Sequence, residues 1–169
     1  MKALWALAIA GLAAAACVAL ISILTSRDSS AVGGASGPGV LEPDHGSKRL
    51  GADAPDTPAS PPALPPTSGD HRAVPIKRDR TELSDDQILE ALQLGNVVIA
   101  YDGEAPTALQ QDPFDPDLAA AGQAVILAKR PGLDGIQALA WRHRLKLSGP
   151  DDPRGRAFIE AYLGQPPSS

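Results

Sequence analysis

Aromatic residues are scarce in this chain, which has two Phe, two Trp and two Tyr among its 169 residues. Five of these six lie between Tyr101 and Tyr162. Because aromatic side chains supply much of the buried area of a core, their distribution predicts a core in the C-terminal half. A domain of about 85 residues buries only a modest share of its surface. We therefore expect a small domain of marginal stability.

Cysteine and basic charge are also in short supply. Cys17 is the one cysteine and lies in an apolar N-terminal run, so the sequence excludes an intramolecular disulfide and a zinc-type cysteine pair. The formal net charge is −5. Because nucleic-acid binding needs a basic face that displaces counterions from phosphate, no nucleic-acid partner is expected.

Motifs of catalysis are missing as well: the chain has no GxSxG, no P-loop and no GxGxxG. Ser148 is near His143 and Asp151 in sequence, but a hydrolytic triad also needs a strained nucleophile turn and an oxyanion site. The three aspartates within 112–117 lack the glycine turn and final glutamate of a calcium loop. The sequence therefore favours a protein that is not an enzyme.

One long apolar run stands out at the N-terminus. Residues 3–24 contain no charged side chain, and about 20 such residues span a bilayer core. We predict that residues 1–27 form a single transmembrane anchor. Two alternatives stay open, a cleaved secretory signal and a lipoprotein signal that ends at Cys17. Lys2 and the amino terminus prefer the cytoplasm, so the rest of the chain is expected to face the periplasm or the cell exterior.

The next stretch, residues 28–80, is dominated by Pro, Gly, Ser, Ala and Asp and shows no periodic apolar pattern. Such a composition cannot bury enough surface to offset the entropy of ordering. We predict a disordered linker, stiffer where proline is dense. Two PxxP spacings leave open a role as a peptide ligand.

A small domain is predicted over residues 81–165, followed by a tail of residues 166–169. Ser84 to Gln87 form a capping box, and Gly95 is typical of a helix end. A helix can be drawn over 136–147, but strict alternation over 141–147 favours a strand with its Arg and Lys side chains toward solvent. The expected elements are a helix over 84–94, a strand over 97–101, short helices over 106–111 and 116–121, strands over 124–128 and 136–147, and a helix over 152–163. This α-β-α-β-β-α order predicts an α+β domain with helices against a short sheet.

Four segments together resemble a bacterial family of uncharacterised domains, the DUF3105 family. Residues 65–71 (PPTSGDH) resemble its PPTSGPH motif, and residues 92–101 (LQLGNVVIAY) resemble its LEHGAVVIxY motif. Residues 131–141 resemble its PGL…AW segment, and residues 158–162 resemble its closing FIxxY helix. The resemblance covers roughly residues 65–165 and brings no established activity.

The chain departs from the family where members usually read HNLEHG. Here Glu90 and Leu94 stand in place of the two histidines. The clustering of those histidines suggests a metal site in the family, which this chain would have lost. His71 remains, and Glu90 could approach it in space, so His71 and Glu90 are the candidate ligands of a degenerate copper or zinc site. His45 is expected to be solvated and His143 to be a partly buried structural residue.

Two functions are therefore kept. The first is a membrane-tethered extracytoplasmic domain without catalytic activity that binds another membrane or extracytoplasmic protein, or serves as an accessory subunit of a membrane complex. The second is a metal-handling domain that uses His71 and Glu90.

Overall fold

The computed structural model describes residues 37–61 and 63–167. The predicted anchor, residues 1–27, lies outside these residues. No helix in the part of the chain that the structure describes is long and apolar enough to cross a membrane.

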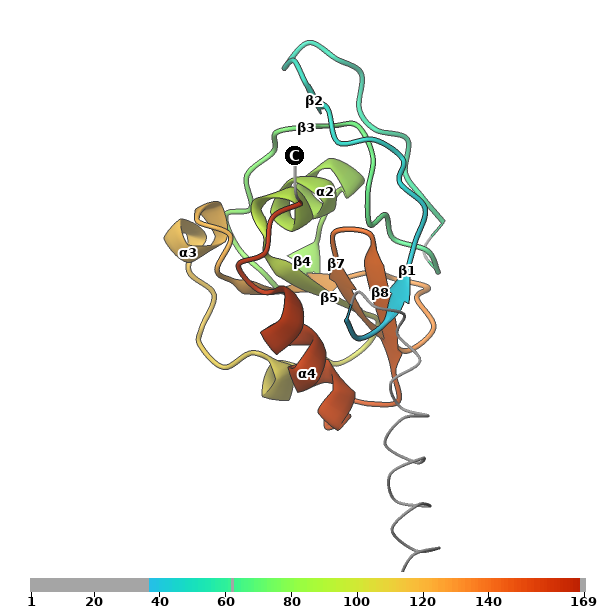
Figure 1. The fold of residues 1–169 in the computed structure, drawn as a ribbon, viewed down its shortest axis with the longest axis vertical. Helices are drawn as coiled ribbons and strands as arrows, with labels where there is room; N and C mark the ends of the chain where they lie inside the picture. The colour runs from blue at the N-terminus through green and yellow to red at the C-terminus, as the bar shows by residue number, and fades with distance from the viewer. Residues whose placement is uncertain (1–36, 62, 168–169) are drawn as a thin grey trace, which may run out of the picture. The chain divides into compact units, whose positions relative to one another are not determined.

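The described chain has a mixed α+β fold, as predicted (Figure 1). Its elements in chain order are β1 (Val40–Leu41), β2 (Arg49–Leu50), β3 (His71–Arg72), β4 (Thr81–Glu82), α2 (Asp85–Leu94), β5 (Val97–Tyr101), the 3₁₀ turn η1 (Thr107–Leu109), α3 (Pro116–Ala120), β6 (Val125–Lys129), β7 (Ile136–Ala140), β8 (His143–Leu147) and α4 (Pro153–Tyr162). Six strands form one sheet in the order β1-β8-β7-β5-β6-β4, and β2 pairs with β3 in a parallel two-stranded sheet.

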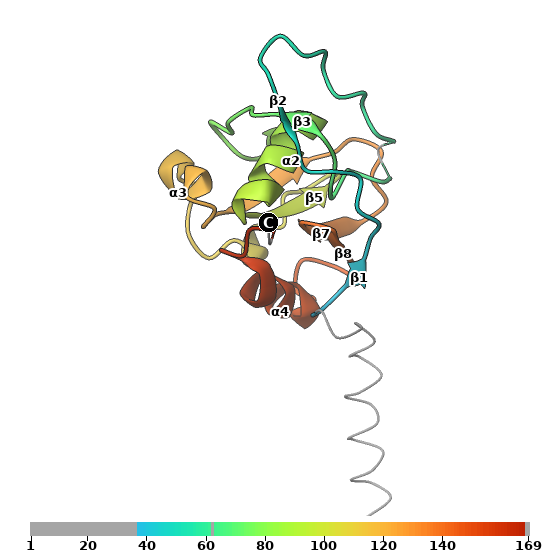
Figure 2. The same ribbon diagram turned by 45° about the horizontal axis from the view of Figure 1, so that its top comes forward.

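The large sheet is covered on both faces, by α2 on one side and α4 on the other (Figure 2). Strand β5 has apolar side chains on both faces of the sheet, because successive side chains of a strand point to opposite faces. Each face therefore needs a covering helix. Val98 and Ala100 join the core under α2, whereas Val97, Ile99 and Tyr101 join the core under α4. The central strand is therefore apolar throughout, as the sequence predicted for a buried strand.

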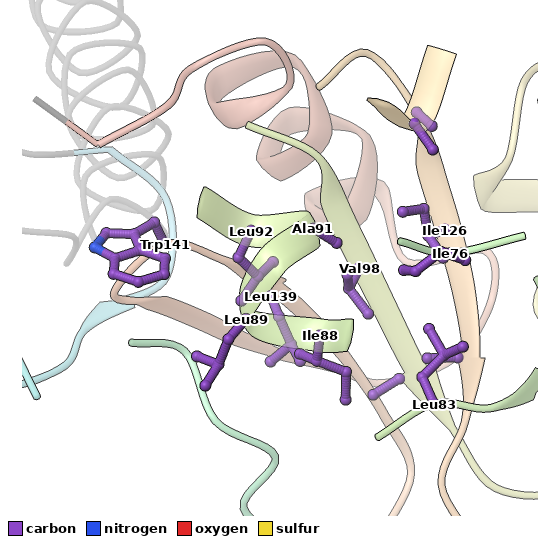
Figure 3. Packing of buried hydrophobic residues seen from close by; sticks show 14 of the residues in the cluster. Ile76, Leu83, Ile88, Leu89, Ala91, Leu92, Val98, Ile126, Leu139 and Trp141 are labelled. Atoms are coloured by element: carbon purple, nitrogen blue, oxygen red, sulfur yellow. The ribbon is translucent and has the colours of Figure 1, made fainter. Parts of the chain in front are cut away.

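Helix α2 begins and ends where its sequence predicts. The Ser84 side chain accepts a hydrogen bond from the Gln87 backbone N–H, and the Gln87 side-chain oxygen accepts one from the Ser84 backbone N–H. Gly95 closes the helix at φ 104°. Figure 3 shows how residues on one side of α2, among them Leu89 and Leu92, pack toward the sheet. This face holds the helix in place, because helical stability in proteins comes mainly from such packing.

The segment predicted as one strand, residues 136–147, is a hairpin of two strands. Ala140 pairs with His143, so Trp141 and Arg142 alone make the turn. Arg142 has φ 59°, a value uncommon for residues other than glycine. Its backbone N–H donates to the Thr67 carbonyl over 2.8 Å, and its carbonyl accepts from the Glu42 N–H over 2.7 Å. Backbone hydrogen bonds with Glu42 and Thr67 thus hold a turn whose own sequence has no Gly or Asn to predict it.

The linker prediction for residues 28–80 needs correction over the described residues, 37–61 and 63–80. This segment runs over the domain, adds β1 to one edge of the large sheet, leads into β4 at the other edge, and carries β2 and β3 beside α2 (Figure 1). Thr67, Ser68, His71 and Ile76 are buried. Composition alone gave no sign of this order, because polar partners and not an apolar stripe hold the segment.

The ion pair between Glu42 and Arg144 holds the start of the segment on β8. Arg144 donates from Nε to Oε1 of Glu42 over 2.6 Å and from Nη2 to Oε2 over 3.0 Å. Arg144 also donates to the Pro65 carbonyl, and Thr67 donates to Glu42. The Arg144 side chain is only 13% exposed, so the predicted solvent-facing basic strand face is wrong at this residue.

Carboxylates at the start of α2 hold the middle of the segment. Asp86 accepts from the Thr57 hydroxyl over 2.6 Å and from the Arg72 backbone N–H over 3.0 Å. Asp85 accepts from the Ser60 backbone N–H and, over 2.7 Å, from Arg130. An acidic first turn also suits the positive end of the helix dipole.

We expect Glu42→Gln to lower the free energy of unfolding by about 2 kcal/mol, a usual value for hydrogen bonds to a charged group. Burial by itself would raise the pKa of Glu42, but hydrogen bonds from Arg144 and Thr67 and the Arg144 charge hold the pKa below its usual value. A lowered folded-state pKa gives stability above the unfolded pKa that is lost as pH falls through the folded one. Urea unfolding at pH 7 and pH 3 should therefore show the larger effect of the substitution at pH 7.

The matched control is Asp134→Asn. Asp134 also has a lowered pKa, through a hydrogen bond from Lys146, but both side chains are exposed, by 85% and 59%. Exposed pairs contribute little, so this substitution should leave unfolding unchanged. Equal effects of the two substitutions would contradict a structural role for the Glu42 pair.

Candidate functional site

His71 is the centre of the candidate site, and its side chain is fully buried. It lies on β3, where its backbone pairs with Arg49 of β2. Its ring also lies near Trp141, at 6.2 Å between centroids. A buried histidine needs hydrogen-bond partners for both ring nitrogens, and the structure supplies two.

The two partners of His71 are both acceptors. Nδ1 lies 2.9 Å from the Gly69 carbonyl oxygen, which can only accept, so Nδ1 carries a proton. Nε2 lies 3.3 Å from Oε2 of Glu90. This second contact is favourable only when a proton lies between the nitrogen and the carboxylate oxygen. The sequence-based expectation that Glu90 approaches His71 is confirmed as a matter of geometry.

Arg49 completes the cluster and was not foreseen. Its Nε donates to Oε2 of Glu90 over 3.1 Å and its Nη2 donates to Oε1 over 2.9 Å. Nε also lies 3.1 Å from the side-chain oxygen of Gln93. Glu90 is thus shared between a buried imidazole and a guanidinium whose side chain is 48% exposed. Arg49 fell in the predicted linker, and nothing in its polar surroundings distinguished it.

The ligand set does not fit a copper or zinc site of ordinary form. Such sites use three or four protein ligands, and the described residues contain no group of three or more His, Cys, Asp or Glu that could hold a metal. Both oxygens of Glu90 already accept from Arg49. His71 and Glu90 together offer two donors, so metal binding by this pair stays a prediction.

A cavity of about 250 Å³ adjoins the cluster, between α2, α3 and residues 73–76. Arg49 and Glu90 are its charged lining residues, and most of the others are apolar. Asn96, also in the wall, is saturated: its Nδ2 donates to the carbonyls of Ala91 and Ala119, and its Oδ1 accepts from the Ala124 N–H. The cavity is therefore apolar with one charged end.

A second hollow, a groove of about 280 Å³, lies between α3, the loop before it and α4. All the charged residues that line this groove are acidic, namely Asp112, Asp115 and Glu160. Between them lie apolar side chains, among which Leu118 is 40% exposed. The aspartates noted in the sequence thus border an apolar groove. Asp115 also caps α3, where it accepts from the Asp117 N–H.

The remaining candidates have structural surroundings. His45 is exposed, as predicted. His143 is partly buried, as predicted, with Nδ1 2.9 Å from the Trp141 carbonyl and its ring on Tyr162. Ser148 does not meet His143 in a hydrogen bond: its hydroxyl donates to Asp152, the N-cap of α4.

The carboxyl group of Asp152 is held in its ionised form. A hydrogen bond from Arg154 lowers the pKa of Asp152 far below its ordinary value, against the effect of burial, and bonds from Ser148 add to the lowering. The carboxylate is therefore held as an acceptor that starts α4, and Ser148 serves the cap.

The chain was compared with known proteins. The model of a family described as "Protein of unknown function (DUF3105)" matches residues 55–169, which is more than half of the chain. No curated protein and no solved structure matches it.

We expect Glu90→Ala to lower the free energy of unfolding by about 2–3 kcal/mol, because it leaves the buried His71 and the half-exposed Arg49 without their shared acceptor. Glu90→Gln should cost less, since the amide oxygen accepts from Arg49 while the amide nitrogen donates to Nε2 of His71. Urea unfolding at pH 7 measures both. Glu104→Ala, at an exposed turn residue, is the control that should change nothing. A larger loss with Gln than with Ala would contradict this arrangement.

Proposed function

This chain belongs to the DUF3105 family, and we propose that it is a membrane-tethered extracytoplasmic domain that binds another protein without catalysing a reaction. The groove between α3 and α4 carries this proposal. Its partner would be a membrane or extracytoplasmic protein, and the chain would act as its accessory subunit.

The chemistry of the groove sets the chemistry of the partner. Phe114, Leu118 and Ile159 give the groove an apolar base, and Asp112 and Glu160 give it negative charge. Complementary charge speeds and orients protein association, and an apolar centre supplies the affinity. The occupant that fits is a basic segment of a partner protein that carries apolar side chains.

The tether and the location rest on the sequence. The uncharged run of residues 3–24 is long enough for an anchor, and Lys2 favours a cytoplasmic amino terminus. Under this proposal the domain works at the surface of the cytoplasmic membrane, on its outer side. Glu90 is paired with Arg49 and His71 is fully buried, which supports a binding protein over an acid–base catalyst that uses these two groups.

Crosslinking tests the groove in the intact protein. We expect a photo-reactive amino acid at Leu118 to give one discrete adduct with a partner in native membranes. Reversing two charges by Asp112→Lys and Glu160→Lys should reduce that adduct about tenfold or more, which corresponds to about 1.4 kcal/mol or more of binding free energy. Asp115 is left unchanged because it caps α3.

The control position is Leu64, which is 57% exposed and does not line the groove. A photo-reactive group there should give no such adduct. The same adduct from Leu64, or an adduct from Leu118 that survives charge reversal, would contradict binding through this groove.

We keep metal handling as a second candidate because His71 Nε2 and Glu90 Oε2 face each other at 3.3 Å. That separation is long for a hydrogen bond and matches two ligands of one tetrahedral ion at about 2.0–2.1 Å each. A copper or zinc ion there would have to displace Arg49 from the carboxylate.

Titration of the full chain with zinc and copper ions tests this candidate. If the pair binds metal, signals of His71 and Glu90 shift saturably at one equivalent in NMR spectra. His71→Ala should abolish the shift and His45→Ala, at an exposed histidine, should preserve it. A shift that survives His71→Ala removes the candidate.

A further inference from the structure

The cavity beside α2 has a shape and a polarity that neither the fold nor the groove requires. Its walls come from α2, α3 with β6, residues 73–76, and Arg49 of β2. Apolar side chains such as Val74, Ile76, Leu94 and Ile126 line most of it. A purely apolar cavity of about 150 Å³ holds benzene, so one of 250 Å³ has room for a ligand of roughly ten non-hydrogen atoms.

At the charged end of the cavity, the Arg49 guanidinium has N–H donors that its hydrogen bonds to Glu90 and Gln93 do not use. Arg49 uses Nε and Nη2 in its bonds to Glu90 and Gln93. Its Nη1 group makes no hydrogen bond to the residues that the structure describes, and a guanidinium carries five N–H donors in a fixed fork. Donors of this kind match a carboxylate.

The other polar groups of the lining do not compete for a ligand. Both oxygens of Glu90 already accept hydrogen bonds, and the Asn96 side chain is saturated by backbone groups. A cationic ligand would meet the Arg49 charge, and the Glu90 carboxylate is already paired with that guanidinium. Among the described residues of the lining, Arg49 is thus the one with a positive charge, and Glu90 holds its guanidinium in place.

We propose that this cavity binds a small apolar monocarboxylate. The carboxylate lies on Nη1 of Arg49, and the apolar body lies among Val74, Ile76, Leu94 and Ile126. The inference is independent of the groove between α3 and α4, and either can fail without the other.

Benzoate and benzylamine are the probes, because they share a ring and differ in charge. The full chain is titrated with each in the same detergent, and binding is read from backbone amide shifts. We expect saturable shifts at residues that line the cavity with benzoate, with a dissociation constant on the order of 1 mM for so small a ligand. Benzylamine should give none.

Two variants locate the binding. Arg49→Met keeps the apolar stem and removes the charge, and should weaken benzoate binding about tenfold or more. Arg78→Met, at an exposed arginine outside the cavity, should leave it unchanged. Because Arg49→Met also releases Glu90, Ala120→Trp serves as a second test: it fills the cavity from an exposed lining position, keeps the Arg49–Glu90 pair, and should abolish binding.

Three results would overturn the proposal. They are equal binding of benzoate and benzylamine, benzoate binding that Ala120→Trp leaves intact, and no saturable shift with benzoate in the unmodified chain.

Discussion

Two buried carboxylates at the first turn of α2 determine how the chain before that helix is arranged. Asp86 binds the hydroxyl of Thr57 and the backbone of Arg72, and Asp85 binds the backbone of Ser60 and the side chain of Arg130. Burial by itself would raise the pKa of Asp86, yet its bonds from Thr57 and Arg72 lower it overall. A buried charge must be paired. These aspartates therefore require the segment before α2, residues 37–80, to pass beside the first turn of the helix.

The segment in turn completes the sheet. Glu42 meets Arg144 on β8, and its backbone N–H donates to the Arg142 carbonyl in the hairpin turn. The edge strands β1 and β4 have two residues each. Such short pairings contribute little by themselves, and the Glu42–Arg144 ion pair beside β1 anchors the start of the segment. The described residues thus combine an apolar three-layer core with a polar, charge-paired covering.

The same covering builds the candidate site. Strands β2 and β3 place Arg49 and His71 opposite each other, and α2 presents Glu90 to both. Arg49 and His71 come from the segment and Glu90 from the helix, so no one of these elements contains the site. The cavity beside it exists because residues 73–76 close over α2 and α3. Loss of the segment's anchoring would therefore open the site as well as the fold.

The sequence by itself determined the local elements. The capping box, the C-terminal glycine of α2, the apolar run of β5 and the Asp-Pro start of α4 each depend on neighbouring residues, and all are present. Tertiary structure decided the course of residues 37–80, the hairpin at Arg142 and the place of Arg49. Their partners lie 14 to 102 residues away, and no local period records such polar pairings.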